Sequence, residues 1–244
     1  MLKFENVTKG YENKKALNGI SLSFKKGKVY ALVGPNGSGK STMMKIATGL
    51  VKPSTGLCTY NDLPIGVESK AKIAYMSTEP FYYDYMRIRQ VFNFHKDFYT
   101  DFNEAKFYDL LKFMELDINM KVKSLSSGMA AKLKITTTLS RDAEVIMLDE
   151  PLNGIDLIGR DQIINAVIKA TNPNSTFIIS SHLFDELEPI VDNVVFIKNG
   201  SVLLDGEIEQ IRLEQKKSIT DLYREIYGSG EGLSNEVWGG KKNA

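Results

Sequence analysis

The sequence contains little cysteine, almost no net charge and no long apolar run, and each absence excludes a class of protein. Cys58 is the only cysteine, which excludes a disulfide framework and a multi-cysteine metal site. The formal net charge is +1, so the chain lacks the electrostatic signature of a nucleic-acid-binding protein. Its apolar runs span only a few residues, far short of the ~20 needed to cross a bilayer. If the protein works at a membrane, we expect another chain to supply the membrane-spanning part.

The remaining composition is ordinary for a globular protein, with 43% hydrophobic and 25% charged residues. The length of 244 residues suits one large domain or two small ones. Residues 1–10 carry charge and no apolar core, so no secretory signal is expected.

One glycine-rich stretch has the pattern of a phosphate-binding loop. It reads Gly34-Pro35-Asn36-Gly37-Ser38-Gly39-Lys40-Ser41, which fits G-x-x-x-x-G-K-S, and Thr42 follows it. The apolar run Val29–Val33 predicts a buried strand before it, and Ser41–Leu50 can form a helix after it. Glycines let the loop turn its N–H groups toward one point, where the helix N-terminus adds partial positive charge. Lys40 offers a cation to the β- and γ-phosphates of a nucleotide, and the Ser41 hydroxyl can ligate Mg²⁺.

Two other stretches place polar side chains at the ends of predicted strands. Val145–Leu148 predicts a buried strand that ends at Asp149 and Glu150. In a P-loop protein the first carboxylate can hold Mg²⁺ and the second can polarise the attacking water; without the loop the pair would indicate only an acidic turn. His182 follows the predicted strand Thr176–Ser180, from where it can reach a γ-phosphate, although a lone histidine is usually structural.

The rest of the chain predicts an α/β protein with a helical insert. Strands are expected at residues 2–8, 16–24, 57–60 and 73–76, and a hairpin at 194–198 and 201–205 across Asn199-Gly200. Residues 87–139 carry aromatics at helical spacing and predict a mainly helical insert. Small residues at 124–128 can cap its last helix, from about 129 to 139. Asp156 is expected to cap a helix that ends near Ala170.

Three regions allow less specific predictions. The aromatic cluster Phe81–Tyr85 is a candidate contact surface. Tyr11 precedes a turn, where it could stack on an adenine ring or be an ordinary exposed tyrosine. Near the C-terminus one short amphipathic helix is predicted by Ile219, Leu222, Tyr223 and Ile226. The glycine-rich tail after it is expected to be flexible, and nothing in the sequence accounts for Trp238.

In their order, these motifs resemble the nucleotide-binding subunit of ABC transporters along almost all of residues 1–212. Gly34–Thr42 resembles the Walker A loop, and Val145–Glu150 resembles the Walker B strand with its catalytic glutamate. Leu125–Met129 looks like the family signature. The D-loop, the switch histidine and the adenine-stacking aromatic of the family are matched by Asn153–Asp156, His182 and Tyr11.

The resemblance implies an α/β fold: a P-loop NTPase of ABC type, with a RecA-like core sheet, an antiparallel β subdomain and a helical subdomain inserted at about 87–139. It implies an ATPase domain over residues 1–212 and a C-terminal extension over 213–244, made of a short helix and a flexible tail. Such subunits dimerise head to tail around two ATPs. The implied partners are a second ATPase subunit and a transmembrane permease, which would hold the chain at the cytoplasmic face of the cell membrane.

The resemblance also assigns roles, with ATP and Mg²⁺ as the expected ligands. It implies that Glu150 is the general base and that His182 contacts the γ-phosphate. Lys40, Ser41 and Asp149 would hold the phosphates and Mg²⁺. The signature residues of the second copy would complete each nucleotide site: Ser126, Ser127 and Gly128. Two departures from the family stand out. Thr78 occupies the place of a Mg²⁺-ligating glutamine, and Ser127 and Met129 replace a glycine and a glutamine of the signature.

Three functions fit these features. The first is an ATPase that powers an exporter of peptides or amphipathic toxic compounds, because the signature and the aromatic insert look like those of bacterial peptide-export ATPases. The second is an ABC ATPase that acts on DNA or ribosomes, which the single ATPase domain and the absence of sustained heptads before Leu125 disfavour. The third is a catalytically weak regulatory subunit, which Thr78 keeps open although Lys40, Glu150 and His182 are all present.

Overall fold

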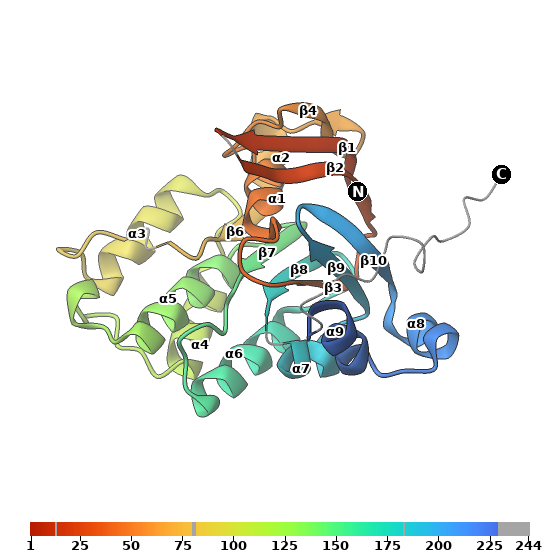
Figure 1. Cartoon of the computed structure of the whole chain (residues 1–244). Coiled ribbons are helices and arrows are strands. Elements are labelled where there is room, and N and C mark those ends of the chain that lie inside the picture. Colours follow the sequence, from red (N-terminus) through yellow and green to blue (C-terminus); the bar gives the residue numbers. More distant parts are fainter. Residues whose placement is uncertain (13, 80–81, 183, 229–244) are drawn as a thin grey trace.

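The computed structural model describes residues 1–12, 14–79, 82–182 and 184–228, which build two sheets surrounded by helices (Figure 1). The larger sheet has the strand order β10-β9-β3-β8-β7-β6. Its strands run parallel, apart from β10, which forms an antiparallel hairpin with β9. They are β3 (Val29–Val33), β6 (Ile73–Met76), β7 (Val145–Asp149), β8 (Thr176–Ser181), β9 (Asn193–Lys198) and β10 (Ser201–Glu207).

The smaller sheet is antiparallel, with the order β2-β1-β4-β5. Its strands are β1 (Leu2–Tyr11), β2 (Lys14–Phe24), β4 (Thr55–Tyr60) and the two-residue β5 (Leu63–Pro64). It packs with helix α1 (Lys40–Ala47) on one face of the larger sheet, where alternate strand residues such as Tyr30, Leu32 and Met147 are buried. The predicted strands are confirmed, and β5 is one that the sequence pattern missed.

The opposite face of the larger sheet is covered in two parts. The intervening strand residues, such as Ile146 and Phe177, pack against helices α3 to α6. Ala31, Val33 and Phe196 instead pack against the helices near the C-terminus. Figure 1 shows α3, α4 and α5 to the left of this sheet and α8 to its lower right. The α-helices beyond α1 are α2 (Val67–Lys72), α3 (Ile88–Phe98), α4 (Glu104–Phe113), α5 (Ser127–Leu139), α6 (Leu157–Ala170), α7 (Phe184–Leu187), α8 (Ile208–Gln215) and α9 (Ile219–Gly228).

Most helices agree with the sequence pattern. The helices predicted within 87–139 are α3, α4 and α5, and Asp156 caps α6 by accepting from the Gly159 N–H at 2.7 Å. In the aromatic cluster, Tyr83 and Tyr85 are exposed and stacked, whereas Tyr82 turns inward and bonds Thr137. Phe81, Trp238 and the predicted flexible tail lie outside the described residues.

The end of the chain's core differs from the predicted boundary at residue 212, which falls inside α8. Helix α9 also belongs to the core, because Ile219, Leu222 and Ile226 are buried against β3 and β9. We therefore propose that the ATPase domain extends through Gly228. The pattern predicted α9 correctly but could not show where its apolar face packs.

The register of the larger sheet determines where its polar residues meet. Val33 of β3 pairs with Ser181 of β8, and Asp149 of β7 pairs with Ser180. Because these strands are parallel, the residues that follow them lie at one edge of the sheet, which is where ligands bind in such folds. The phosphate-loop residues, Glu150 and His182 all come directly after these strands.

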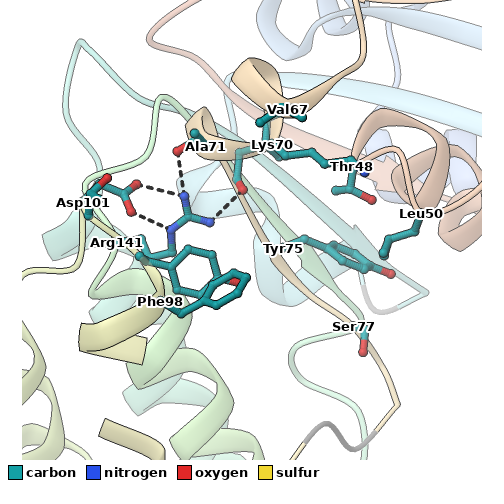
Figure 2. A pocket seen from close by; sticks show the side chains of 13 residues that line it. Thr48, Leu50, Val67, Lys70, Ala71, Tyr75, Ser77, Phe98, Asp101 and Arg141 are labelled. Carbon is teal, nitrogen blue, oxygen red and sulfur yellow. Dashed lines mark hydrogen bonds and ion pairs between the residues drawn. The ribbon is translucent and has the colours of Figure 1, made fainter. Parts of the chain in front are cut away.

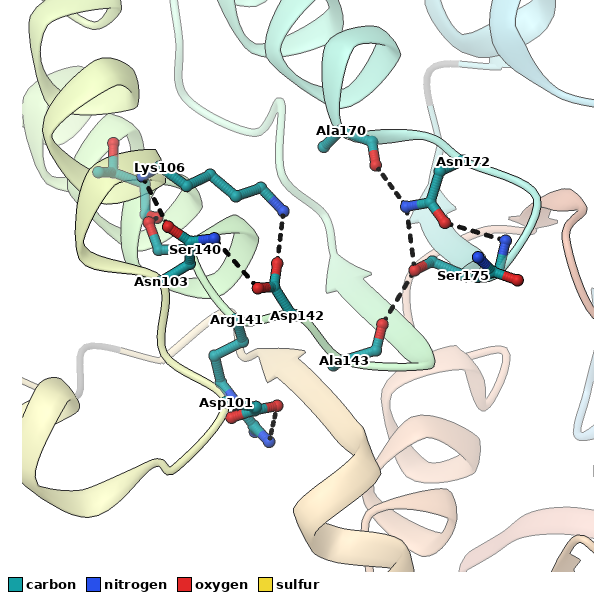
Figure 3. A network of polar contacts seen from close by, with 12 residues as sticks. Asp101, Asn103, Lys106, Ser140, Arg141, Asp142, Ala143, Ala170, Asn172 and Ser175 are labelled. Atoms are coloured by element: carbon teal, nitrogen blue, oxygen red, sulfur yellow. Dashed lines mark hydrogen bonds and ion pairs between the residues drawn. The ribbon is translucent and has the colours of Figure 1, made fainter.

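A buried arginine joins the helical insert to the core (Figure 3). Arg141 is 5% exposed, and its side chain donates two hydrogen bonds to Asp101, at 2.9 and 3.0 Å. It also donates to the carbonyls of Ile73 (2.9 Å) and Ala71 (2.7 Å), and its guanidinium lies 4.1 Å from the centre of the Tyr99 ring. A buried guanidinium needs such partners, so these contacts fix the end of α3 to the start of β6.

Candidate nucleotide site

Close packing holds the phosphate-binding loop in shape. A Cβ on Gly34 would lie 2.3 Å from the Ile197 carbonyl oxygen, and one on Gly39 would lie 2.7 Å from the Ala16 oxygen. Gly39 also has a φ of 116°, which side-chain-bearing residues rarely adopt. The turn of the β9–β10 hairpin packs on the loop, where the Gly200 N–H donates to the Ser38 carbonyl at 2.9 Å. The predicted strand, loop and helix are therefore present, with the loop held between two hairpins.

The loop offers unused polar groups to a ligand. The Ser38 hydroxyl oxygen is buried and has no hydrogen-bond partner among the described residues. The loop leads into α1, whose Lys40 begins the helix and whose first N–H groups point back toward it. An orphaned buried hydroxyl beside a helix N-terminus fits a bound phosphate, which would accept from both.

Lys40, Glu150 and His182 form one connected group at the loop. Lys40 is 4% exposed, and its ammonium donates to the carbonyls of Gly34 (2.7 Å) and Pro35 (3.3 Å). The same nitrogen lies 3.1 Å from Glu150 Oε1, and His182 Nδ1 lies 2.8 Å from Glu150 Oε2. Lys40 at the start of α1 and His182 after β8 therefore meet at the carboxylate that follows β7, as their predicted positions implied.

One oxygen of the Glu150 carboxylate, Oε1, is available to accept a hydrogen bond. Oε1 is ion-paired with Lys40 but accepts no hydrogen bond within the described part of the chain. Glu150 has a φ of 49°, in the left-handed region, so the chain turns sharply where β7 ends. A buried carboxylate with an open lone pair is suited to accept a proton from water.

Asp149 is fully buried at the end of β7. Its Oδ1 accepts from the Ser180 hydroxyl at 2.6 Å, and its Oδ2 accepts from the Tyr75 hydroxyl at 3.2 Å. Burial, and then the charge of Asp149, raise the pKa of Tyr75, so this hydroxyl stays a donor. Ser180 also accepts from the Glu150 N–H at 2.9 Å and so orients both acids. Ser180 and Tyr75 were not among the predicted site residues, although each is polar in an apolar strand.

A resident Mg²⁺ would need ligands from outside the protein. Among the described residues no group of three or more histidines, cysteines or acids could hold a metal ion. The oxygens available at the loop are those of Ser41, which is half-buried, and Asp149. Since Mg²⁺ usually combines one or two protein oxygens with water and phosphate oxygens, this donor set fits an ion that arrives with a nucleotide.

Thr78 lines a cavity of about 360 Å³ together with Asp149, Glu150 and Ser127. The Thr78 side chain is exposed, and Thr78 accepts a hydrogen bond through its backbone carbonyl. Lys134 of α5, a residue that the sequence analysis missed, donates to the carbonyls of Thr78 (3.0 Å) and Glu79 (3.2 Å). Glu79 in turn pairs with Lys45 of α1 at 2.9 Å. The segment after β6 thus links α5 to α1.

We expect Lys134→Met to slow ATP hydrolysis about two- to tenfold, because a hydrogen bond of ordinary net strength is worth that factor and two carbonyls lose their donor. Burial lowers the pKa of Lys134, and the charges of Asp149 and Glu79 oppose that shift, so the ammonium is part of the site's charge balance. Steady-state rates at saturating ATP measure the effect. Lys134→Arg should restore most of the rate, and Lys112→Met, on an exposed part of α4, should leave it unchanged. An unaltered Lys134→Met rate would contradict this role.

The signature residues lie at an exposed helix end. Ser126 caps α5 by accepting from the Met129 N–H at 3.2 Å, and Ser127 is helical, without a positive φ. Ser126 and Ser127 are exposed. Within the described ranges no hydrogen bond or ion pair connects Ser126, Ser127 or Gly128 to the phosphate-binding loop. The structure therefore leaves this helix end open to a second molecule.

Tyr11 lies at the end of β1 and is 44% exposed, with the Lys9 ammonium 5.0 Å from its ring centre. Its strand partner Lys14 places a side-chain nitrogen 3.4 Å from where a Cβ on Gly37 would be. Tyr11 is therefore on the strand pair that borders the loop. Adenine stacking remains a prediction.

A larger cavity, of about 610 Å³, lies away from the loop (Figure 2). It is lined by α2, β6 and the segment from Phe98 to Asp101, and Arg141 and Asp101 form one end of it. Phe98 and Val67 on its walls are exposed apolar residues. No residue of Gly34–Thr42 lines this cavity, so it is separate from the nucleotide site.

Similarity to known proteins agrees with this geometry. The family model described as ABC transporter matches residues 17–153, more than half of the chain. The chain belongs to the ABC transporter family. The lantibiotic transport ATP-binding protein SrtF of Streptococcus pyogenes is 34% identical over 217 residues, covering 86% of this chain and 92% of the relative. The predicted family and the predicted enzyme class, an ABC ATPase, are thereby confirmed.

Two solved structures show the same fold. An ATP-binding subunit of an ABC transporter superposes with a TM-score of 0.83 at 24% identity, covering 93% of this chain and 99% of the other. A dimeric ATP-binding cassette in a post-hydrolysis state with ADP and Pi superposes with a TM-score of 0.76 at 23% identity, covering 85% of this chain and 98% of the other. The predicted fold class is confirmed. No helix within the described residues is long and apolar enough to cross a membrane.

Proposed function

We propose that this ABC ATPase powers a membrane exporter, with each ATP held between two ATPase chains. The observation that carries the catalytic part is the convergence of Lys40, Glu150 and His182 at the phosphate-binding loop. The Glu150 carboxylate lies between the two groups proposed to bind the γ-phosphate. Phosphate binding would therefore release Glu150 from Lys40, which leaves its Oε1 free to accept a proton from the attacking water.

The other residues hold and orient the reactants. Lys40 would exchange its contacts to the loop carbonyls for the phosphates, and the N–H groups around Ser38 would bind the same oxygens. His182 would contact the γ-phosphate as well as Glu150, which lies 2.8 Å from its Nδ1. Ser41 and Asp149, with Thr78 as a further candidate, would hold Mg²⁺, which neutralises charge on the phosphate oxygens when it is bound.

The exposed signature supports the dimeric part of the proposal. One chain presents Ser126–Gly128 at an exposed helix N-terminus, a position that favours a bound anion. Within the described residues, no hydrogen bond or ion pair joins it to the loop of the same chain. A second ATPase chain, arranged head to tail, would bring the two together. The solved cassette that is dimeric in a post-hydrolysis state provides a precedent within the fold.

The relative SrtF supports peptide export, and an exposed aromatic surface supports contact with a permease. SrtF is named for lantibiotic transport. A permease would supply the membrane-spanning part, and the exposed pair Tyr83 and Tyr85 (65% and 72%) offers it a contact surface beside the helical insert. The chain would then work at the cytoplasmic face of the membrane. Its near-neutral charge gives no reason to propose a nucleic-acid partner.

A purified-protein assay distinguishes this function from a catalytically weak regulatory subunit. We expect the wild-type chain to release phosphate from ATP when Mg²⁺ is present and to stop when the ion is chelated by EDTA. Nucleotide binding without turnover would favour the regulatory alternative.

For the cargo, cells that carry the permease should lose resistance to a lantibiotic when only a Glu150→Gln chain is supplied. Unchanged resistance would contradict peptide export.

A further inference from the structure

The C-terminal helix α9 lies against the strand ends from which the phosphate-binding loop starts. Its apolar face packs on Val33, which ends β3, and on Phe196, which lies two residues before the end of β9. Both belong to the same hydrophobic cluster as α9. The Tyr227 ring stacks on Phe196 with centroids 6.1 Å apart. The Lys198 ammonium donates to the Ile226 carbonyl at 2.7 Å, which fixes the end of the helix to β9.

The Tyr227 hydroxyl bridges these two strands. It lies 3.1 Å from the Val33 carbonyl oxygen and 3.0 Å from the Ile197 oxygen, so it can share its proton between them. Val33 directly precedes Gly34, and the Ile197 oxygen is the atom that a Cβ on Gly34 would strike at 2.3 Å. Burial raises the pKa of Tyr227, so the hydroxyl stays a donor. One side chain thus holds both carbonyls that border the first glycine of the loop.

Consecutive carbonyls of the loop depend on two side-chain donors. Tyr227 donates at Val33, and Lys40 donates at Gly34 and Pro35. Phosphate binding draws Lys40 away from its two carbonyls. Among the donors described here, the Tyr227 hydroxyl would then be the side-chain group that still holds the start of the loop.

We propose that Tyr227 is a positioning residue for the nucleotide site: its hydroxyl keeps the start of the phosphate-binding loop in place while Lys40 transfers from protein carbonyls to phosphates. The proposal rests on the proposed function of Lys40. The same helix also contacts the element after the switch histidine, since the Thr220 hydroxyl donates to Asp185 of α7 at 2.5 Å. Helix α9 is thereby bonded both to the strand end before the loop and to α7, which follows His182.

The test is Tyr227→Phe, which keeps the ring and removes only the hydroxyl. We expect the Kd and the KM for Mg-ATP to rise about two- to tenfold, the factor set by one hydrogen bond, with kcat within about twofold of wild type. Tyr223→Phe is the matched control on the same helix, because the Tyr223 hydroxyl bonds no group within the described part of the chain. It should bind Mg-ATP as the wild type does.

Nucleotide affinity separates positioning from simple stabilisation. A Tyr227→Phe chain that melts at lower temperature but binds Mg-ATP with wild-type Kd would overturn the proposal. If Tyr227→Phe does not fold, Lys198→Met provides a second test, because it frees the end of α9 from β9 and should weaken binding in the same direction. Unchanged affinity there would also overturn it. A wild-type chain that fails to bind Mg-ATP would overturn the proposed function together with this inference, which distinguishes the two failures.

Discussion

Glu150→Gln is expected to lower steady-state ATP hydrolysis by at least about 100-fold, the lower limit for removing a general base. The amide cannot take the proton of the attacking water. It also removes the negative charge that lies 3.1 Å from Lys40 Nζ and 2.8 Å from His182 Nδ1. Both groups are then released to the phosphates, so ATP should bind at least as tightly as in the wild type. Turnover falls while binding is kept, which identifies a catalytic role.

Two measurements check this result. Phosphate release gives the rate, and size-exclusion chromatography with Mg-ATP should show a dimer that persists because the nucleotide is not cleaved. Glu209→Gln, at an exposed position of α8, is the charge-matched control and should match the wild type in both. Equal hydrolysis by the wild type and Glu150→Gln would exclude Glu150 as the base and return the regulatory alternative.

Lys40→Met should instead weaken nucleotide binding strongly. Removing one member of a buried, hydrogen-bonded charge pair costs about 2–5 kcal/mol of binding energy, which weakens Mg-ATP binding by roughly 30-fold or more. Lys40 is 4% exposed, so solvent screens its charge only weakly. The two variants should therefore differ: Lys40→Met weakens nucleotide binding, whereas Glu150→Gln keeps binding and loses turnover.

The Lys40 substitution should also affect the protein without nucleotide. It leaves the buried Glu150 carboxylate without its lysine partner and with the His182 contact alone, so the free energy of unfolding should fall. The loss of one partner from a buried pair costs about 3–5 kcal/mol, which is an upper bound here because His182 stays. Urea denaturation measures it, with Lys112→Met as control. Wild-type affinity for Mg-ATP in Lys40→Met would contradict the assignment of Lys40.

Local patterns were enough to predict the parts of the site that depend on neighbouring residues. The loop at 34–41, the acids after Val145–Leu148 and the Asp156 cap each rest on a few consecutive residues, and each lies as predicted. The positions of Glu150 and His182 also followed, because parallel strands end at the same edge of the sheet.

Contacts between distant segments could not be predicted in this way. Tyr227 reaches Val33 across most of the chain, and an amphipathic helix does not reveal which strand it covers. Lys134 has an ordinary position on a helix, and only the fold brings it to the Thr78 carbonyl. Arg141 gave no signal because its partners Asp101 and Ile73 lie on separate elements. The sequence predicted the residues proposed for the chemistry, but not the side chains that hold the surrounding segments in place.

The central claim is that each catalytic site combines the loop of one chain with the signature of another. Mixing two inactive variants tests it most directly. Lys40→Met disables the loop and keeps the signature, and Ser126→Arg blocks the exposed signature and keeps the loop. Each variant alone should hydrolyse almost no ATP. An equimolar mixture should regain roughly a quarter of the wild-type rate if chains pair at random and sites act independently, because mixed dimers contain one intact composite site. A mixture as inactive as its components, or a Ser126→Arg chain with full activity alone, would contradict the claim.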